Sequence, residues 1–257
     1  MTAPIFELTD VTYRYHGAIT ALAGIDLVVA GGESVVLLGA NGCGKSTLLQ
    51  ILDGLLFPAA GRVRAFGTEL SEEKLETDPF RRFFRSRVGF VFQNPDIQLF
   101  CPTVAEEAAF GPLQLDLPAA EAAGRVEDVL AMLGLSGLRE RSPLHLSGGE
   151  KKKVAIASVL TMNPAVLLFD EPTTALDPRT RYWFMELAQE LAGAGKTIVT
   201  ATHDLALAER IATRVVVIGE DHRVAAAGAP AEILADRELL VGTNLLHEAD
   251  RYRYAGQ

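Results

Sequence analysis

The sequence predicts an α/β protein with a mainly parallel sheet and helices on both of its faces. First, a glycine-rich segment at 39–47 follows an apolar, β-branched run at 34–38 and precedes a helical pattern. Second, apolar strand patterns and helical patterns alternate from 165 to 218. A third observation adds a feature to this class: prolines punctuate Ala- and Leu-rich segments from 94 to about 144, which indicates a helical insertion.

Strands dominate the prediction before the insertion. Apolar runs bounded by turn residues predict an opening strand from the segments 6–8 and 11–15, and further strands at 25–29, 34–38, 62–66 and 87–92. One helix begins at Thr47 and ends before Gly54 and Pro58. We expect the polar residues 70–86 to be irregular.

Helices and strands alternate after the insertion begins. Helical patterns predict helices at 119–133, 151–160, 178–192 and 205–212. Continuous apolar runs predict buried strands at 165–169, 197–200 and 215–218.

Residues 39–47 fit the phosphate-binding pattern G-x-x-x-x-G-K-[ST]. We expect all nine of them to surround a nucleotide: Gly39, Ala40, Asn41, Gly42, Cys43, Gly44, Lys45, Ser46 and Thr47. The glycines bring backbone N–H groups close to an anion, and the helix N-terminus adds partial positive charge. Lys45 would reach the β- and γ-phosphates, and the Ser46 hydroxyl would ligate Mg²⁺. The segment therefore predicts a nucleoside triphosphate site.

Cys43, inside this segment, allows two interpretations. Its position beside Lys45 and a helix N-terminus favours a reactive thiolate. Alternatively, Cys43 is a small residue that fills a tight loop. The spacing of Cys43 and Cys101 is not one that metal-binding cysteines have. We also expect no structural disulfide, because we expect the protein in a reducing compartment.

Polar residues follow predicted strands at the sheet edge where open α/β proteins bind their ligands. Asp170 ends an apolar strand and supplies an oxygen toward Mg²⁺, and Glu171 is placed to orient and deprotonate an attacking water. His203 follows the strand at 197–200 and is either structural or functional there. Gln93 ends another strand, so its amide is placed to contact the metal or the water.

Two further features surround this edge. Tyr15 is either an aromatic that stacks on adenine or one that packs across strands. Residues 146–150 form a second Ser/Gly turn before a helix, hence a second anion site. One nucleotide does not need two phosphate-binding turns in one subunit.

Composition excludes several classes of function. The chain has 257 residues, 49% of them hydrophobic, so it can bury a large core. Its net charge of −9 argues against a nucleic-acid partner. No apolar run approaches the ~18 residues of a membrane span, and the N-terminus lacks the layout of a signal peptide. We therefore expect a cytosolic protein.

These motifs, in this order and over nearly the whole chain, resemble the ATP-binding cassette of ABC transporters. Residues 39–47 resemble Walker A, Gln93 the Q-loop, and 146–150 the signature with its Ser147, Gly148 and Gly149, although position 150 is Glu rather than Gln. Residues 166–171 resemble Walker B, Asp177 ends the D-loop, and His203 resembles the switch histidine. The resemblance also assigns Tyr15 to adenine stacking.

What the resemblance implies is a P-loop NTPase of the cassette type that binds ATP and Mg²⁺. Residues 1–93 and 165–235 would form a RecA-like core with an N-terminal β subdomain, 94–164 a helical subdomain and 236–257 a helical tail. In that family two cassettes, identical or related, dimerise head to tail. Each signature then closes on the ATP of the other cassette, which explains the duplicated anion site.

A finer resemblance is to the ATPases of energy-coupling-factor importers, through 92–100 and 147–157, and to their nickel/cobalt members. It implies a peripheral ATPase at the cytoplasmic face of the membrane. Its partners would be a transmembrane coupling protein and a substrate-binding membrane subunit. Two alternatives stay open: a vitamin importer ATPase, and a cassette without transport such as the scaffold ATPase of iron–sulfur cluster assembly.

The segment 94–100 predicts how the membrane partner is contacted. It ends in Leu99 and Phe100, two residues before Pro102, and the resemblance implies a groove that accepts a short helix of the coupling protein. Burial of both side chains within the helical insertion is the alternative.

Overall fold

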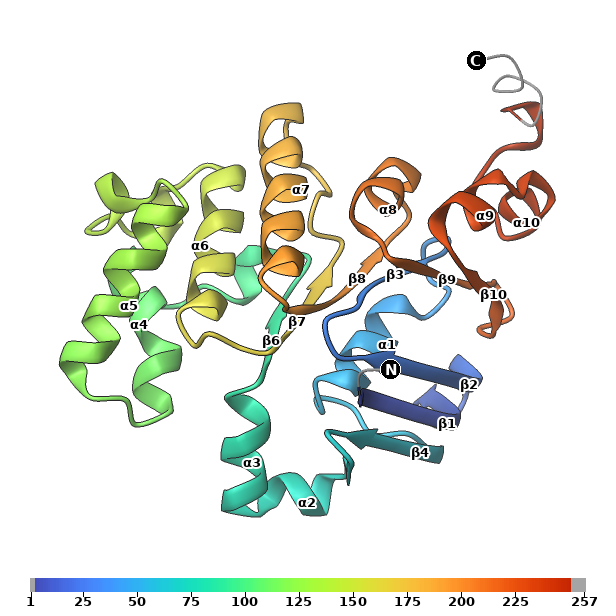
Figure 1. The fold of residues 1–257 in the computed structure, drawn as a ribbon, viewed down its shortest axis with the longest axis horizontal. Coiled ribbons are helices and arrows are strands. Elements are labelled where there is room, and N and C mark those ends of the chain that lie inside the picture. Colours follow the sequence, from blue (N-terminus) through green and yellow to red (C-terminus); the bar gives the residue numbers. More distant parts are fainter. Residues whose placement is uncertain (1–2, 251–257) are drawn as a thin grey trace.

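A six-stranded sheet forms the centre of the computed structural model, which describes residues 3–250 (Figure 1). In spatial order its strands are β10 (Val224–Gly228), β9 (Arg214–Ile218), β3 (Ser34–Leu38), β8 (Thr197–Thr202), β7 (Val166–Asp170) and β6 (Val88–Val91). All neighbours from β9 to β6 run parallel, and β10 pairs antiparallel with β9. The mainly parallel α/β class predicted from the sequence is confirmed.

Helices cover both faces of this sheet. The helices are α1 (Lys45–Leu52), α2 (Glu72–Glu76), α3 (Asp78–Arg85), α4 (Val104–Gln114), α5 (Ala119–Met132), α6 (Gly148–Leu160), α7 (Pro178–Gly193), α8 (Leu205–Ile211), α9 (Pro230–Ala235) and α10 (Arg237–Gly242). Successive strand side chains point to opposite faces. Val36 and Leu38 of β3 accordingly belong to one buried cluster with α7 and α8, whereas Val35 and Leu37 belong to another with α1.

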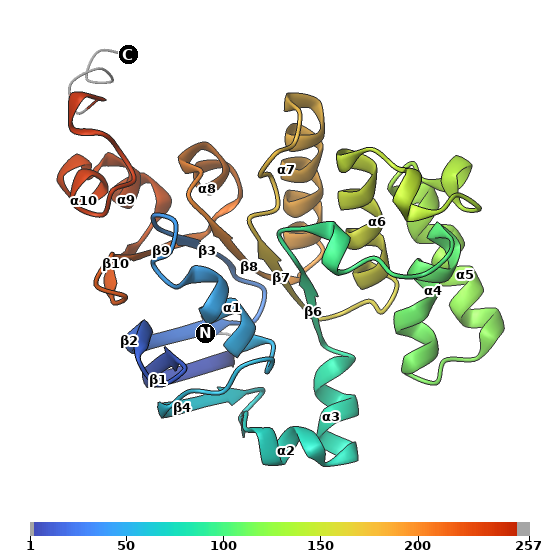
Figure 2. The same ribbon diagram turned by 180° about the vertical axis from the view of Figure 1, so that it is seen from behind.

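A second, antiparallel sheet packs against the α1 side (Figure 2). Its strands lie in the order β2 (Ile19–Ala30), β1 (Pro4–Tyr15), β4 (Ala60–Ala65) and β5 (Thr68–Glu69). The opening strand predicted from 6–8 and 11–15 is confirmed, because β1 continues through irregular pairing with β2 between Leu8 and Val11.

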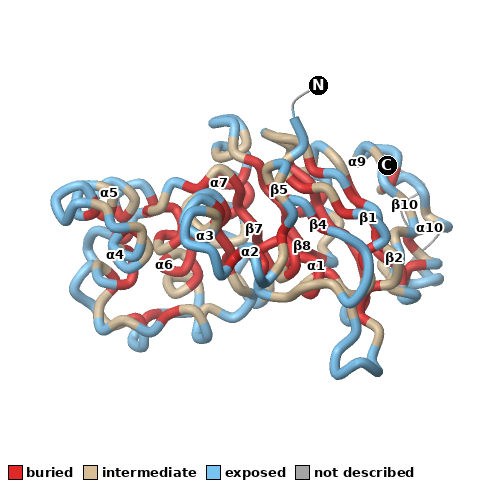
Figure 3. The backbone as a smooth tube through the Cα atoms, turned by 90° about the horizontal axis from the view of Figure 1, so that it is seen from below, coloured by how far each residue is buried: buried red, intermediate tan, exposed pale blue. Residues whose placement is uncertain are grey.

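Helices α4, α5 and α6 pack together beyond the β6 edge of the large sheet (Figure 1). Two of them begin with a capping box, in which a hydroxyl and a carboxylate satisfy each other's backbone N–H groups. Thr103 and Glu106 form the box of α4, and Ser147 and Glu150 that of α6. Buried residues continue from the strands into α6 and α7 (Figure 3).

The prediction for residues 70–86 is wrong, because they form α2 and α3. Ser71 accepts a hydrogen bond from the N–H of Lys74 and so starts α2, and Pro79 stands in the first turn of α3. Of the tail predicted at 236–257, α10 lies within the described part and residues 251–257 lie outside it. The subdomain boundaries remain our own division of the chain.

Within residues 3–250, no helix combines the length and the apolar character that crossing a membrane requires.

Candidate nucleotide site and adjoining groove

The glycine-rich segment joins the end of β3 to the start of α1, as predicted. Gly42 and Gly44 have φ of 85° and 111°, in the left-handed region that favours glycine. A Cβ at Gly44 would lie 2.1 Å from the carbonyl oxygen of Ala21, so a side chain has no room there. The loop thus approaches the small sheet so closely that only glycine fits.

A cavity of about 530 Å³ opens over this loop. It is lined by Tyr15, Ile19, Thr20, Ala21, Asn41, Gly42, Gly44, Lys45, Ser46, Thr47, Gln93, Glu171 and His222. The structure therefore brings predicted residues from β1, the loop, the end of β6 and the end of β7 to one place.

Lys45 is buried and carries its charge into this site. Its Nζ donates hydrogen bonds to the carbonyl oxygens of Gly39 and Ala40, at 2.8 and 2.9 Å. The same Nζ lies 3.7 Å from Oε1 of Glu171. The ammonium is therefore held between the loop and the end of β7, where a phosphate chain on the loop would meet it.

The residues present fit a Mg²⁺ ion. Ser46 Oγ donates a hydrogen bond to Asp170 Oδ1 at 2.9 Å, which places a hydroxyl and a carboxylate side by side. Burial raises the pKa of Asp170, and the hydrogen bond from Ser46 opposes that rise. Gln93 adds an amide oxygen on the same cavity. Oxygen donors with room left for phosphates and water are the environment that Mg²⁺ prefers.

Glu171 is enclosed by polar groups. Its Oε1 lies 3.0 Å from Nδ1 of His203, and its Oε2 accepts a hydrogen bond from Thr174 Oγ1 at 3.2 Å. The backbone of Glu171 has a φ of 41°, so it bends directly after β7. This turn directs a buried carboxylate toward the cavity, with the half-exposed imidazole of His203 on its other side. The pair has the geometry of a general base and its orienting partner.

Tyr15 lies at the rim of the cavity, partly exposed. Its hydroxyl is 3.1 Å from Thr47 Oγ1, and its ring meets Tyr13 edge-on at 5.0 Å. One ring face can therefore accept a base while the edge contact fixes the ring.

Sequence reasoning missed His222 as a lining residue. It stands in the turn between β9 and β10 with a φ of 64°, and its Nδ1 lies 3.2 Å from the carbonyl oxygen of Cys43. The polar turn at 219–223 was visible in the sequence, but its place beside the phosphate loop depends on the pairing of β9 with β3.

Ser147, Gly148 and Gly149 do not line this cavity. Gly148 instead lines a separate hollow together with Gln93 and Thr174. Asp177 caps α7 by accepting hydrogen bonds from the hydroxyl and the N–H of Thr180 and from the N–H of Arg179, and these bonds, first that of the Thr180 hydroxyl, lower its pKa. A Cβ at Gly149 would touch Thr180 at 3.1 Å, so the signature turn and the start of α7 pack together. Both stay outside the chain's own nucleotide cavity.

The thiolate interpretation of Cys43 is wrong. Its side chain is buried, and burial raises its pKa by more than Lys45 lowers it. A Cβ added at Gly39 would lie 2.5 Å from its Sγ. Cys43 therefore fills the interior of the tight loop, as the alternative interpretation predicts.

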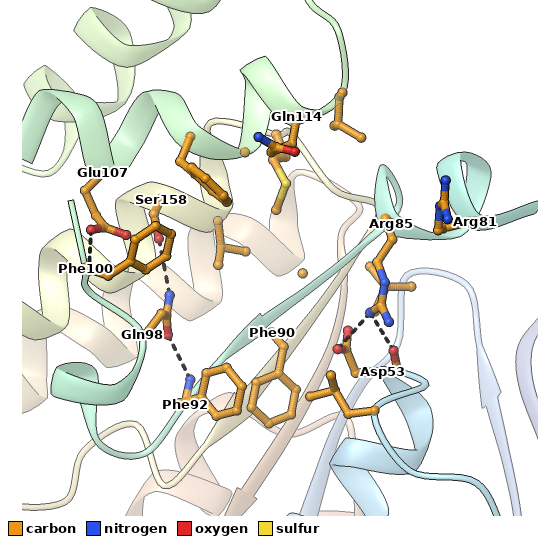
Figure 4. Close-up of a pocket in the computed structure, with 18 of the residues that line it drawn as sticks. Asp53, Arg81, Arg85, Phe90, Phe92, Gln98, Phe100, Glu107, Gln114 and Ser158 are labelled. Carbon is orange, nitrogen blue, oxygen red and sulfur yellow. Dashed lines mark hydrogen bonds and ion pairs between the residues drawn. The ribbon is translucent and has the colours of Figure 1, made fainter. Parts of the chain in front are cut away.

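A second cavity, of about 490 Å³, lies between α3, the end of β6, α4 and α6 (Figure 4). Apolar side chains form most of its lining: Leu55, Val88, Phe90, Phe92, Phe100, Phe110, Leu115, Val159 and Met162. The prediction that Leu99 and Phe100 both anchor a partner helix is wrong for Leu99. This residue is 9% exposed and packs in the hydrophobic core together with α4, α5 and α6. Phe100 is 66% exposed and lines the cavity.

Charged residues close one side of this second cavity. Arg85 donates hydrogen bonds to the carboxylate of Asp53, at 3.0 Å, and to its carbonyl oxygen, at 2.8 Å. Burial raises the pKa of Asp53 to about 7, although Arg85 acts in the opposite direction. Figure 4 shows this pair on the wall opposite Glu107 and Phe100.

The fold and the first cavity define an enzyme class, the P-loop nucleoside triphosphatases. The protein-family model described as ABC transporter matches residues 22–174, and the chain belongs to that family, as an ATP-binding cassette ATPase.

Named relatives agree with this assignment. The chain is 52% identical to the nickel import ATP-binding protein NikO of Rhodobacter capsulatus, over 95% of this chain and 96% of that protein. It is 45% identical to the energy-coupling factor transporter ATP-binding protein EcfA of Methanothermobacter thermautotrophicus, over 92% and 74%.

Solved structures show the same fold. CbiO1 of Clostridium perfringens, part of the ABC transporter complex cbiONQ, superposes with a TM-score of 0.80 at 35% identity, over 97% and 98% of the two chains. The cassette MJ0796, a dimer bound to ADP and Pi, gives a TM-score of 0.77 at 31% identity, over 88% and 98%.

Proposed function

We propose that this chain is the ATP-hydrolysing subunit of an energy-coupling-factor importer, and that it powers uptake of nickel or cobalt through separate membrane subunits. The observation that carries the proposal is the 52% identity to a nickel import ATPase along nearly the full length of both chains. Similarity to EcfA favours the same machinery with another solute, such as a vitamin, as the second candidate.

The site supports a specific division of roles. Residues 39–47 and Tyr15 would hold ATP, and Ser46, Asp170 and Gln93 would hold Mg²⁺, which supplies charge neutralisation on the phosphates when bound. Glu171 would accept the proton of the attacking water while His203 holds its carboxylate in place. Lys45 would neutralise charge that grows on the phosphates during transfer.

Two copies are needed for a complete site in this proposal. Gly148 and Gly149 present backbone N–H groups at the start of α6, and neither they nor Ser147 line their own chain's nucleotide cavity. In a head-to-tail dimer they would meet the ATP of the partner cassette, with Asp177 beside them. That the similar cassette MJ0796 is a dimer with ADP and Pi bound supports the pairing of two cassettes.

The second cavity is the surface we assign to the transmembrane partner. Its aromatic lining suits a short amphipathic helix, which inserts apolar side chains into such a groove. Phe92 lies on this groove, and the next residue, Gln93, lies on the nucleotide cavity. Nucleotide-dependent movement of Gln93 would therefore displace Phe92 and, with it, a partner helix bound in the groove. The cassette would then work at the cytoplasmic face of the membrane.

Metal uptake tests the proposal directly. The chain is expressed with the membrane proteins encoded beside it, and accumulation of radioactive nickel and cobalt is compared with that of labelled vitamins. We expect metal accumulation that depends on Glu171. Accumulation of a vitamin instead would move the assignment to the second candidate, and dependence of neither solute on the chain would refute an import role.

Two neighbouring residues test the groove. Phe100→Ser should leave the melting temperature nearly unchanged but abolish co-purification with the membrane proteins. Leu99→Ser should act on the fold instead, since polar replacement of a buried apolar residue costs a few kcal/mol. Retained co-purification of Phe100→Ser would show that docking occurs elsewhere.

A further inference from the structure

Lys152 is a buried lysine that none of the proposed roles uses. It stands in the second turn of α6, and only 1% of it is exposed. Its Nζ donates hydrogen bonds to the carbonyl oxygens of Phe92, at 3.1 Å, and Gln93, at 2.7 Å. Its neighbours on the helix point elsewhere, with Lys151 bound to Asp96 and Lys153 over the ring of Trp183.

An ammonium in this place is costly. Burial lowers the pKa of Lys152 to about 8, against the attraction of Asp170. Both hydrogen-bond partners are backbone carbonyls, which compensate a buried charge less than a carboxylate does. An apolar side chain of similar length would fill the same volume without desolvating a charge. The ammonium, unlike an apolar side chain, holds two backbone carbonyl groups in place directly after β6.

Other side chains fasten the same segment to the same helix. Gln98 Oε1 accepts a hydrogen bond from the N–H of Phe92 at 3.1 Å (Figure 4). Its Nε2 donates to the carbonyl oxygen of Ala155 at 2.8 Å. Asp96 and Lys151 form an ion pair at 2.6 Å. Residues 92–98 are thus bound to α6 at both ends, with Lys152 holding the end that carries Gln93.

We propose that Lys152 is a positioning residue, which sets the place of Gln93 in the nucleotide cavity by holding the backbone of Phe92 and Gln93 against α6. The signature residues Ser147, Gly148 and Gly149 begin the same helix. Gln93 would contact the ATP of its own chain, and the signature turn would contact the ATP of the partner. Because both are attached to α6, they would move together. This inference rests on the proposed role of Gln93 and goes beyond it, because Lys152 itself does not line the nucleotide cavity.

The test is a double-mutant cycle on the full chain assembled with its membrane partners. Lys152→Met, Gln93→Ala and the double variant are compared for ATP turnover and for affinity of a non-hydrolysable ATP analogue. We expect each single variant to lower kcat by about 10- to 100-fold, within the range of a misplaced catalytic contact. Analogue affinity should change less than about threefold. The double variant should be no slower than the slower single variant.

A matched control is Lys153→Met, which makes the same change one residue further along α6 and leaves the bonds to Phe92 and Gln93 intact. Its turnover should equal that of the unmodified chain. Melting temperatures of all variants separate a positioning effect from loss of fold. If Lys152→Met does not fold, the cycle is run with Lys152→Gln, which keeps N–H donors and should slow turnover by about 3- to 10-fold.

The outcomes separate the inference from its foundation. Unchanged turnover of Gln93→Ala would overturn the role of Gln93 and the inference with it. Slow turnover of Gln93→Ala with unchanged turnover of Lys152→Met would overturn the inference alone. Effects that multiply in the double variant would also overturn it, because Lys152 would then act independently of Gln93.

Discussion

Replacing Glu171 by Gln should stop ATP hydrolysis while leaving ATP binding intact. The Glu171 side chain is 7% exposed, and its two carboxylate oxygens are engaged by His203 and Thr174. Glutamine has the same shape and retains an acceptor for the hydroxyl of Thr174, so the fold should tolerate the change. What it lacks is a site that takes a proton from water.

The expected loss follows from the chemistry of a positioned general base. Such a base contributes about 10²–10⁴ in rate, or about 3–5 kcal/mol of transition-state stabilisation. Binding should not weaken, because the variant only removes a negative charge that lies 3.7 Å from Lys45 Nζ. Without this neighbouring carboxylate, less of the Lys45 charge is neutralised within the protein, so its attraction for the phosphates and the affinity for ATP should stay equal or rise.

Steady-state phosphate release and equilibrium binding of ATP measure the two effects separately. A sizing column should show the variant accumulating as an ATP-bound dimer, since hydrolysis no longer separates the cassettes. Glu76→Gln, which changes an exposed carboxylate of α2, is the control and should hydrolyse ATP normally. Turnover of Glu171→Gln within about threefold of the unmodified chain would refute the assignment of the base.

Three other predictions test neighbouring features. Lys45→Ala should lose productive ATP binding and Ser147→Arg should block closure across the dimer; mixing the two inactive variants should restore part of the ATPase activity, and no recovery under subunit exchange would contradict shared sites. Because the pKa of Asp53 is raised in the folded state, that state binds more protons than the unfolded chain between about pH 4 and 7. The stability of the unmodified chain, relative to that of Asp53→Asn, should therefore fall as pH rises through this range. Melting temperatures of the two proteins that change equally with pH would contradict this prediction. Maleimide should label Cys43 slowly even without nucleotide, because its thiol is buried with a raised pKa; rapid labelling would show that the loop opens.

Much of the nucleotide site was predictable from sequence because its information is local. The glycines at 42 and 44, Lys45 and Ser46 act through one loop between a strand and a helix, and spacing alone fixes that order. Asp170 and Glu171 were found because parallel strands end at one edge. Their hydrogen bonds to Ser46 and His203 required the tertiary structure.

Other features could not be read from the chain because opposing effects decide them. For Cys43, local charge favours a thiolate and burial opposes it, and burial is a tertiary property. Leu99 and Phe100 are adjacent and equally apolar, yet one is buried and the other exposed. Helices α2 and α3 have five and eight residues, fewer than the window over which an apolar period is recognised, although Phe80, Phe83 and Phe84 of α3 do follow helical spacing.

The short helix α1 touches both functional surfaces of the molecule. Its N-terminus forms part of the phosphate loop, and Asp53, its C-cap, stands in the wall of the groove assigned to the membrane partner. Eight residues span about 12 Å, so a tilt of about 5° at the phosphate end displaces the far end by about 1 Å. A tilt of α1 on nucleotide binding would therefore act in parallel with the Gln93 segment, as a second mechanical connection between the nucleotide and the groove.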